Sequence, residues 1–169
     1  MTFLEKPMPF KPTDDPRAFR NALGRFATGI TVVTIMTEQG PVGITANSFT
    51  SVSLDPALVL WSPAKGSRRH DLFVGATYFA VHVLAADQRA VCDGFTTAWN
   101  AFDGLDVIRN PENVPIIQGC LAVFECRTSN IVDAGDHTLI LGEVYAAAER
   151  AGDALLFASG KYASLPIDG

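Results

Sequence analysis

Cysteine, histidine and charged residues are all scarce in this chain of 169 residues. It has three cysteines, three histidines and 18% charged residues. Cys92, Cys120 and Cys126 form no CxxC pair, and the histidines are widely separated, so the ligand spacing of a metal site is missing. An odd number of thiols placed in apolar segments predicts reduced, buried cysteines in a cytoplasmic protein.

Positive charge is also in short supply. Lysine and arginine number 13 against 18 acidic residues, the net charge is −5, and no basic run occurs. This balance argues against nucleic-acid binding through phosphate contacts. No apolar run approaches membrane-spanning length, and residues 1–12 lack the apolar core of a signal peptide. We therefore expect neither nucleic acid nor membrane among the partners.

The motifs of several enzyme classes are missing as well. No GxGxxG follows a predicted strand, and neither a GxSxG elbow nor an HExxH motif occurs. No cluster pairs a nucleophile with a base. The chain therefore supplies little catalytic machinery of its own.

Apolar residues, in contrast, make up 48% of the chain. A chain of this length can bury a sizeable core within one domain. Its composition is apolar for a monomer, so we expect part of the surface to be covered by a second copy in a homodimer. Three prolines predict an extended N-terminal arm over residues 1–13, and residues 14–169 are expected to form a single domain.

Short apolar and β-branched runs separated by turns predict a mainly β fold. The six or so expected strands, with short turns and a few flanking helices, suggest a closed Greek-key barrel. In one helix, which Asp14 or Asp15 would cap, Phe19 and Phe26 are predicted to be core anchors. His82 is expected in the core or an interface, and residues 96–114 as a packed lid or subunit contact. Outside the central stretch, strands are expected at 30–37, 57–61, 77–84, 120–131, 138–145 and, as the last one, 154–158.

The central stretch, residues 43–54, carries five hydroxyls, one amide and no charge. Ile44 and Ala46 alternate with polar neighbours, and the phase slips at Ser48 and Phe49, which predicts a strand, a sharp bend and a second strand. Such a bend points polar side chains and backbone N–H groups into one concavity, where they can hold a phosphate or a polar ring edge. Ordinary bonds from these hydroxyls to the backbone fit the pattern equally well.

The same stretch resembles the signature of the flavin reductase-like family. The similarity lies in TANSF at residues 45–49, followed by SVSLDP at residues 51–56. RFATGITVVT at 25–34, GDH at 135–137 and GKY at 160–162 resemble further motifs of the family in the same order. The resemblance implies an FMN-binding split barrel. It also implies the small reductase component of a two-component flavin-dependent monooxygenase, in which NAD(P)H reduces FMN or FAD and the reduced flavin leaves for a separate oxygenase.

The resemblance also implies roles for individual residues. The ring edge and ribityl side of the flavin would be held by Thr45, Ala46, Asn47 and Ser48, and the ribityl and phosphate region shaped by Ser51, Val52 and Ser53. His137 resembles the histidine that orients the nicotinamide, although a turn histidine bonded to Asp136 fits too. Tyr162 resembles a C-terminal aromatic residue near the site.

A basic segment, residues 62–69, has a family counterpart near the flavin phosphate. Ser67 can cap a short helix there, and a cation beside a helix N-terminus suits a phosphate. We expect a phosphate contact from at least one of Lys65, Ser67 and Arg68, against the alternative of a solvated loop.

Two other functions fit parts of the sequence. A pyridoxamine-phosphate oxidase-like enzyme also uses a split barrel but keeps FMN as a prosthetic group, and a non-enzymatic FMN-binding protein would store flavin or carry electrons. The GDH turn argues against both, because neither requires a nicotinamide contact. FMN and FAD, and NADH and NADPH, are equally compatible with the sequence.

Overall fold

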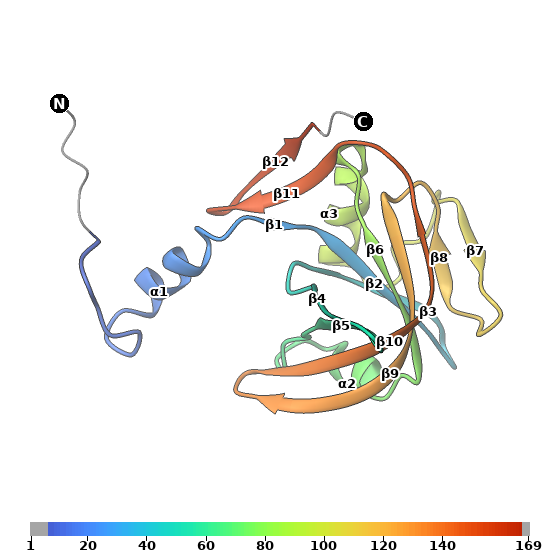
Figure 1. The fold of residues 1–169 in the computed structure, drawn as a ribbon, viewed down its shortest axis with the longest axis horizontal. Helices are drawn as coiled ribbons and strands as arrows, with labels where there is room; N and C mark the ends of the chain where they lie inside the picture. Colours follow the sequence, from blue (N-terminus) through green and yellow to red (C-terminus); the bar gives the residue numbers. More distant parts are fainter. Residues whose placement is uncertain (1–6, 167–169) are drawn as a thin grey trace.

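The computed structural model describes residues 7–166; residues 1–6 and 167–169 lie outside the described part. The chain is built mainly from antiparallel strands with three α-helices and a short 3₁₀ helix (Figure 1). In order, the elements are α1 (Pro16–Leu23), β1 (Thr28–Gly29), β2 (Thr31–Thr37), β3 (Gly40–Ala46), β4 (Thr50–Leu54), β5 (Ala57–Trp61), α2 (His70–Val74), β6 (Tyr78–Val83), η1 (Ala86–Gln88), α3 (Arg89–Thr97), β7 (Val107–Arg109), β8 (Pro115–Ile117), β9 (Ala122–Ala134), β10 (His137–Glu149), β11 (Ala154–Ala158) and β12 (Lys161–Leu165).

The main sheet is split rather than closed. Its strands follow the order β3-β2-β6-β9-β10-β5-β4, so β3 and β4 are its two edges although only residues 47–49 separate them in the chain. The expected mainly β, split-barrel fold is therefore confirmed, although the sheet does not close into the complete barrel that was expected. The expected strand, bend and second strand are also confirmed. The backbone leaves the sheet where the apolar phase slips, which prevents β3 and β4 from forming a hairpin.

Two apolar clusters hold the sheet in shape. One fills the inside of the curved sheet around Trp61, Phe73 and Phe79. The other lies between β2, α3 and β11 and includes Phe95. His82 is completely buried, as expected for a core histidine. The three cysteines are buried and free, and burial raises the pKa of Cys126 to about 12, which fits inert thiols.

The C-terminal end differs from the sequence-based expectation. A further strand, β12, follows the strand predicted to be the last one and pairs with it. Together with β1 these two strands form a separate three-stranded sheet. The 96–114 segment also contains more order than expected, because β7 lies within it and pairs with β8.

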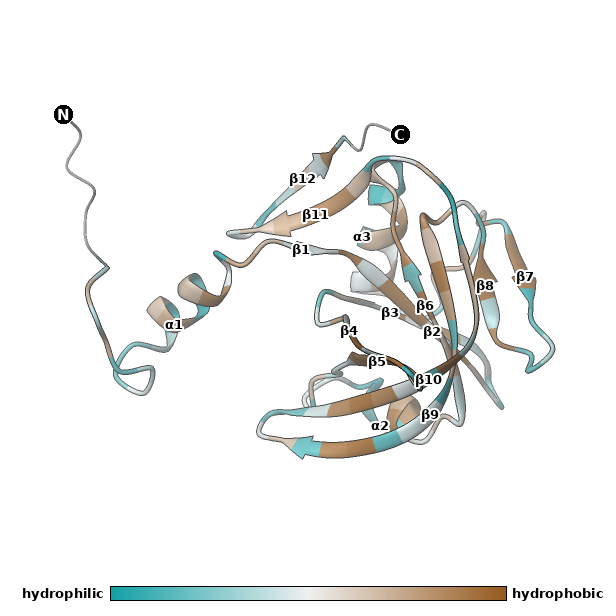
Figure 2. Ribbon diagram, in the orientation of Figure 1, coloured by the Kyte–Doolittle hydropathy of each residue, from teal (hydrophilic) through white to brown (hydrophobic). Residues whose placement is uncertain are grey.

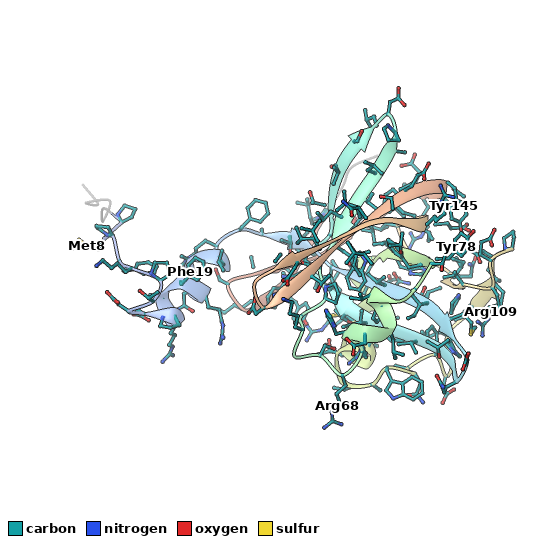
Figure 3. All side chains as sticks on the ribbon, turned by 90° about the horizontal axis from the view of Figure 1, so that it is seen from below. Met8, Phe19, Arg68, Tyr78, Arg109 and Tyr145 are labelled. Carbon is teal, nitrogen blue, oxygen red and sulfur yellow. The ribbon has the colours of Figure 1, made fainter. Side chains whose placement is uncertain are left out.

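Helix α1 lies apart from the barrel, at the end of an extended connection (Figures 1 and 3). Asp15 caps it as predicted, by accepting a hydrogen bond from the N–H of Ala18 at 2.8 Å. Phe19 and Phe26 are 42% and 79% exposed, so their predicted role as core anchors is wrong within one chain. The apolar face of the helix was predicted from its spacing, but no part of the described chain covers it. Figure 2 shows that α1, like the sheet, carries hydrophobic residues.

The described part of the predicted N-terminal arm, residues 7–13, is exposed and contains no helix or strand. In residues 7–166 no helix is both long enough and apolar enough to cross a membrane.

Candidate functional site

The last two residues of β3, both predicted flavin contacts, are tied into the protein itself. The Thr45 hydroxyl donates to the carbonyl oxygen of Cys92 at 2.7 Å, which fastens the strand to α3. The Ala46 carbonyl accepts a hydrogen bond from the Thr31 hydroxyl at 2.7 Å. Any ligand contact by these two residues must therefore use their remaining backbone or surface atoms.

The next two residues, Asn47 and Ser48, lie in the bend between β3 and β4 (residues 47–49, here called the split), and only Ser48 is bonded within the protein. The Ser48 hydroxyl accepts from the N–H of Ser62 at 2.9 Å and lies 3.2 Å from the carbonyl oxygen of the same residue, to which it donates. It thereby ties the split to the basic segment. Asn47 is exposed, and its side chain has no hydrogen-bond partner in the described chain. Of the four predicted ring contacts, Asn47 is thus the one whose polar side chain is available to a ligand.

Strand β4 supplies the other predicted flavin contacts. Its pairing with β5 shifts register between Ser51 and Ser53, which leaves Val52 without a partner there, and the Val52 side chain is 49% exposed. Because β4 is a sheet edge, one side of its backbone faces no neighbouring strand in the described chain. An edge of this kind offers N–H and C=O groups to a polar ring.

The basic segment lies directly against the GDH turn. The Lys65 ammonium forms an ion pair with Asp133 and donates to the Gly135 carbonyl at 2.7 Å. The hydrogen bond that the Lys65 ammonium donates to the Asp133 carboxylate, together with its positive charge, lowers the pKa of Asp133. The Lys65 backbone N–H also donates to the Asp136 carbonyl at 2.8 Å. The two bonds of the Lys65 ammonium join residues that are 68 and 70 positions apart in the chain. The basic segment and the GDH turn therefore form one continuous wall.

The predicted helix cap in this segment is wrong. Helix α2 begins at His70, and no side chain caps it. The Ser67 hydroxyl instead accepts a hydrogen bond from the Arg69 N–H at 3.2 Å within the preceding turn. Arg68 is exposed and projects away from the protein (Figure 3). Because Lys65 is already paired, Arg68 is the cation of this segment that is open to a ligand.

His137 is the first residue of β10, immediately after a tight turn. Gly135 has a φ of 64°, which a glycine adopts without steric cost. The His137 Nδ1 lies 2.8 Å from an Asp136 carboxylate oxygen, and this contact lowers the pKa of Asp136. The imidazole remains 42% exposed. The turn therefore orients the ring while leaving it accessible, so the bond to Asp136 and a ligand contact are compatible.

Tyr162 lies on β12 and packs on α3 rather than on the GDH turn. The guanidinium of Arg89 stacks 3.4 Å from its ring centroid, and its hydroxyl lies 3.5 Å from the Cys92 sulfur. Its ring meets Phe157 edge-on, with centroids 5.0 Å apart. Tyr162 therefore lies apart from His137. Its link to the candidate site is Phe157, which lines the cleft described next.

A cleft of about 580 Å³ lies beside the split. It is lined by the C-terminal half of α1 and the residues that follow it, the start of β1, the end of β11 with the turn to β12, and Asn47. Asn47 is the predicted site residue that lines it. The cleft extends the wall formed by the split and the GDH turn toward the N-terminal helix.

Three further residues at the site were missed from the sequence. Thr28 lines the cleft, and its hydroxyl is buried without a partner in the described chain. Arg69, rather than its neighbour, points inward and donates to the Phe95 carbonyl at 2.6 Å. His70 lies 2.8 Å from the Thr138 hydroxyl and braces the start of β10. A run of two arginines and a histidine was visible in the sequence, but which of them points inward depends on the fold.

Comparison with known proteins agrees with this architecture. The chain is 58% identical over 149 residues to the FMN reductase (NADH) SmoA of Agrobacterium fabrum, covering 88% of this chain and 86% of that protein. It is 38% identical over 156 residues to HsaB of Rhodococcus jostii, the reductase subunit of a flavin-dependent monooxygenase, covering 91% and 80%. Some other curated relatives are longer, and the chain spans 42–65% of their length.

The solved structures give the same result. The NADH:FAD oxidoreductase SgcE6 of Streptomyces globisporus superposes with a TM-score of 0.89 at 36% identity, covering 97% of this chain and 100% of that one. The family model described as flavin reductase like domain matches residues 23–166. The chain therefore belongs to the flavin reductase-like family.

Proposed function

We propose that this chain is an NAD(P)H:flavin oxidoreductase that supplies reduced FMN or FAD to a separate monooxygenase. The observation that carries the proposal is the continuous wall formed by the split, the basic segment and the GDH turn. Ser48 bonds to Ser62, and Lys65 bonds to Asp136, so the bend at residues 47–49, the basic segment and the distant GDH turn are held side by side. SmoA is named as an NADH-dependent FMN reductase and SgcE6 as an NADH:FAD oxidoreductase, which supports the same activity here.

The groups left unpaired along this wall fit a flavin. The open edge of β4 and the Asn47 amide provide donors and acceptors for the polar ring edge, and Arg68 provides a cation for the phosphate. When bound, the flavin would supply the ring that accepts a hydride from the reduced nicotinamide, and the reduced flavin would then leave the protein. The chain itself binds and orients the two reactants, and His137 positions the nicotinamide.

The activity is tested by steady-state oxidation of NADH and NADPH with FMN, FAD and riboflavin in catalytic excess. We expect oxidation that depends on added flavin. No oxidation in any of the six combinations would refute the reductase function, and flavin that survives extensive dialysis would favour the prosthetic-group alternative.

We further propose that the protein works as a cytoplasmic homodimer that delivers flavin to its oxygenase. The exposed apolar face of α1 and the edge strand β4, where Leu54 is 98% exposed, are surfaces that a second copy would cover. HsaB, named as a monooxygenase reductase subunit, supports the oxygenase partner. The buried, free thiols support the cytoplasm.

Light scattering tests the dimer. It should give about twice the chain mass of 18.1 kDa, and Phe19→Ser should shift the distribution toward monomer. Arg17→Ser, at an exposed polar position of the same helix, is the matched control and should leave the mass unchanged. A wild-type monomer with full activity would rule the dimer out.

A further inference from the structure

The face of β10 opposite His137 carries a buried anchor. Successive side chains of a strand point to opposite faces, so the Thr138 side chain points away from the exposed imidazole of its neighbour. Thr138 is 6% exposed, and its hydroxyl lies 2.8 Å from the Nε2 of His70 at the start of α2. The Thr138 N–H donates to the Pro63 carbonyl at 3.1 Å. The residue after His137 is therefore held by both its backbone and its side chain.

The imidazole of His70 is the acceptor in this contact. Its Nδ1 lies 2.7 Å from a carboxylate oxygen of Asp71, and an ionised carboxylate only accepts hydrogen bonds, so Nδ1 carries the proton. In the neutral ring Nε2 then accepts, and the Thr138 hydroxyl donates to it. The order of the three groups is that of a nucleophilic triad. Because Thr138 is buried, however, this chain of bonds fixes the strand and presents no nucleophile to a substrate.

Helix α2 is anchored on both sides of His70. Phe73, three residues later on the helix, is 1% exposed and meets Trp61 edge-on, with ring centroids 5.1 Å apart. Arg69, the residue before His70, donates to the Phe95 carbonyl of α3 at 2.6 Å. The His70 side chain is itself only 14% exposed. The bond to Thr138 therefore connects β10 to a helix that is packed into the core.

The other side-chain contact beside His137 is a weaker restraint. Its partner in that contact, the Asp136 carboxylate, is 96% exposed, and ion pairs so open to water contribute little. The imidazole itself is 42% exposed, so few neighbours restrict it. Its direction follows from the backbone of β10 at this point, which the buried Thr138 holds against α2.

We propose that His70 is a positioning residue for His137 and acts through the Thr138 hydroxyl. The inference rests on the proposed reductase function, in which His137 orients the nicotinamide. Holding Thr138 against α2 keeps the imidazole on the opposite face aimed at the nicotinamide, in the geometry that hydride transfer requires. His70 acts from the other face of β10 and is not itself a contact of either reactant.

Steady-state kinetics with NADH at saturating flavin provides the first test. His70→Ala should raise the KM for NADH about three- to tenfold, the range expected for one neutral hydrogen bond, and leave the Kd for flavin nearly unchanged. Thr138→Val, which removes the hydroxyl but keeps the shape, should have the same effect. His70→Gln should recover most of the loss, because its amide oxygen can accept from Thr138. An unchanged KM in His70→Ala would overturn the inference.

The matched control is Thr128 of β9. Its hydroxyl donates to the Ala76 carbonyl at 2.7 Å, just beyond the other end of α2, and it pairs with Gly142 of β10, away from the GDH turn. Thr128→Val therefore removes a similar bond between this helix and the sheet. It should lower the melting temperature about as much as Thr138→Val does and leave the KM for NADH unchanged. An equal rise of the KM in both variants would assign the effect to general loosening and overturn the inference.

A double variant separates action through His137 from an independent effect. If His70 acts through His137, adding His70→Ala to His137→Ala should raise the KM for NADH no further, so the two effects are not additive. Effects that multiply would show that His70 acts independently of His137, and would overturn the inference.

The ring signals of His137 in NMR spectra test the same bond without enzyme activity. These signals are assigned by their loss in His137→Ala. They should move in His70→Ala and Thr138→Val but not in Thr128→Val. Signals that stay in place in all three variants would overturn the inference, whether or not the protein oxidises NADH. Signals that move in a protein that oxidises neither NADH nor NADPH would support the bracing of His137 while refuting the reductase function.

Discussion

The barrel and the N-terminal cleft treat their polar side chains in opposite ways. In the barrel, the hydroxyl of Thr34 donates to the Pro115 carbonyl at 2.6 Å, and His82 bonds on both sides of its ring. The indole N–H of Trp61 is the exception. Around the cleft, the side chains of Thr28, Arg20 and Arg25 have no hydrogen-bond partner within residues 7–166. The interior of the barrel thus satisfies most of its polar side chains within one chain, whereas the cleft leaves polar side chains open to a ligand or a second chain.

His82 gives the largest expected effect on the barrel. Its Nδ1 lies 3.0 Å from the Val32 carbonyl, and its Nε2 accepts the Ile117 N–H at 3.1 Å, so the ring is held neutral. Burial lowers the pKa of His82 to about 4. Because the unfolded chain binds the proton near pH 6.5, this contribution to stability is present above pH 6.5. It is lost as the pH falls to about 4.

The loss should amount to about 3 kcal/mol of unfolding free energy across that range. Urea unfolding at several pH values measures it. In His82→Gln this part of the pH dependence should be absent; an unchanged profile would show that other groups cause it.

Gly43 tests the packing of the barrel against α3. A Cβ at this position would lie 2.5 Å from a ring carbon of Phe95. Gly43→Ala should therefore lower the free energy of unfolding by about 1–3 kcal/mol. Gly66→Ala, where no atom lies within 4 Å of the added Cβ, should have little effect or stabilise slightly. Equal melting temperatures for the two variants would contradict this packing argument.

His137 and Asn47 test how the two ends of the site divide the ligands. His137→Ala should raise the apparent KM for NAD(P)H about tenfold, because one hydrogen bond to the nicotinamide is lost. The Kd for flavin should remain nearly unchanged. Asn47→Ala should weaken flavin first. Initial rates at saturating flavin and fluorescence quenching provide the two values. If His137→Ala weakens both ligands equally, the histidine is a structural residue of the turn.

Ser48 and Ser51 separate a scaffold role from a contact role. Ser48→Ala removes the bonds to Ser62 and should lower the free energy of unfolding by about 1 kcal/mol while weakening flavin. Ser51→Ala, on the exposed edge strand, should weaken flavin without changing stability. A loss of stability in Ser51→Ala but not in Ser48→Ala would show that Ser51 has the structural role and Ser48 the ligand contact.

The sequence predicted the elements whose signal is local. Alternation predicted most of the strands, the phase slip at Ser48 and Phe49 predicted the bend, and a cap at Asp14 or Asp15 predicted the start of α1. What it could not predict depends on the surroundings. The spacing of Phe19 and Phe26 marks an apolar face but says nothing of what covers it. Likewise, Arg68 and Arg69 are equivalent in sequence, and only the positions of β3 and α3 decide that Arg69 points inward.

The hydrogen bond between Gly24 and Ser159 spans 135 residues. Contacts of such long sequence separation form late, since the intervening chain must first be ordered. Helix α1 is synthesised well before its anchor, which lies in the hairpin of β11 and β12. Helix α1 can therefore be anchored, and the cleft completed, only after the turn between β11 and β12 has formed.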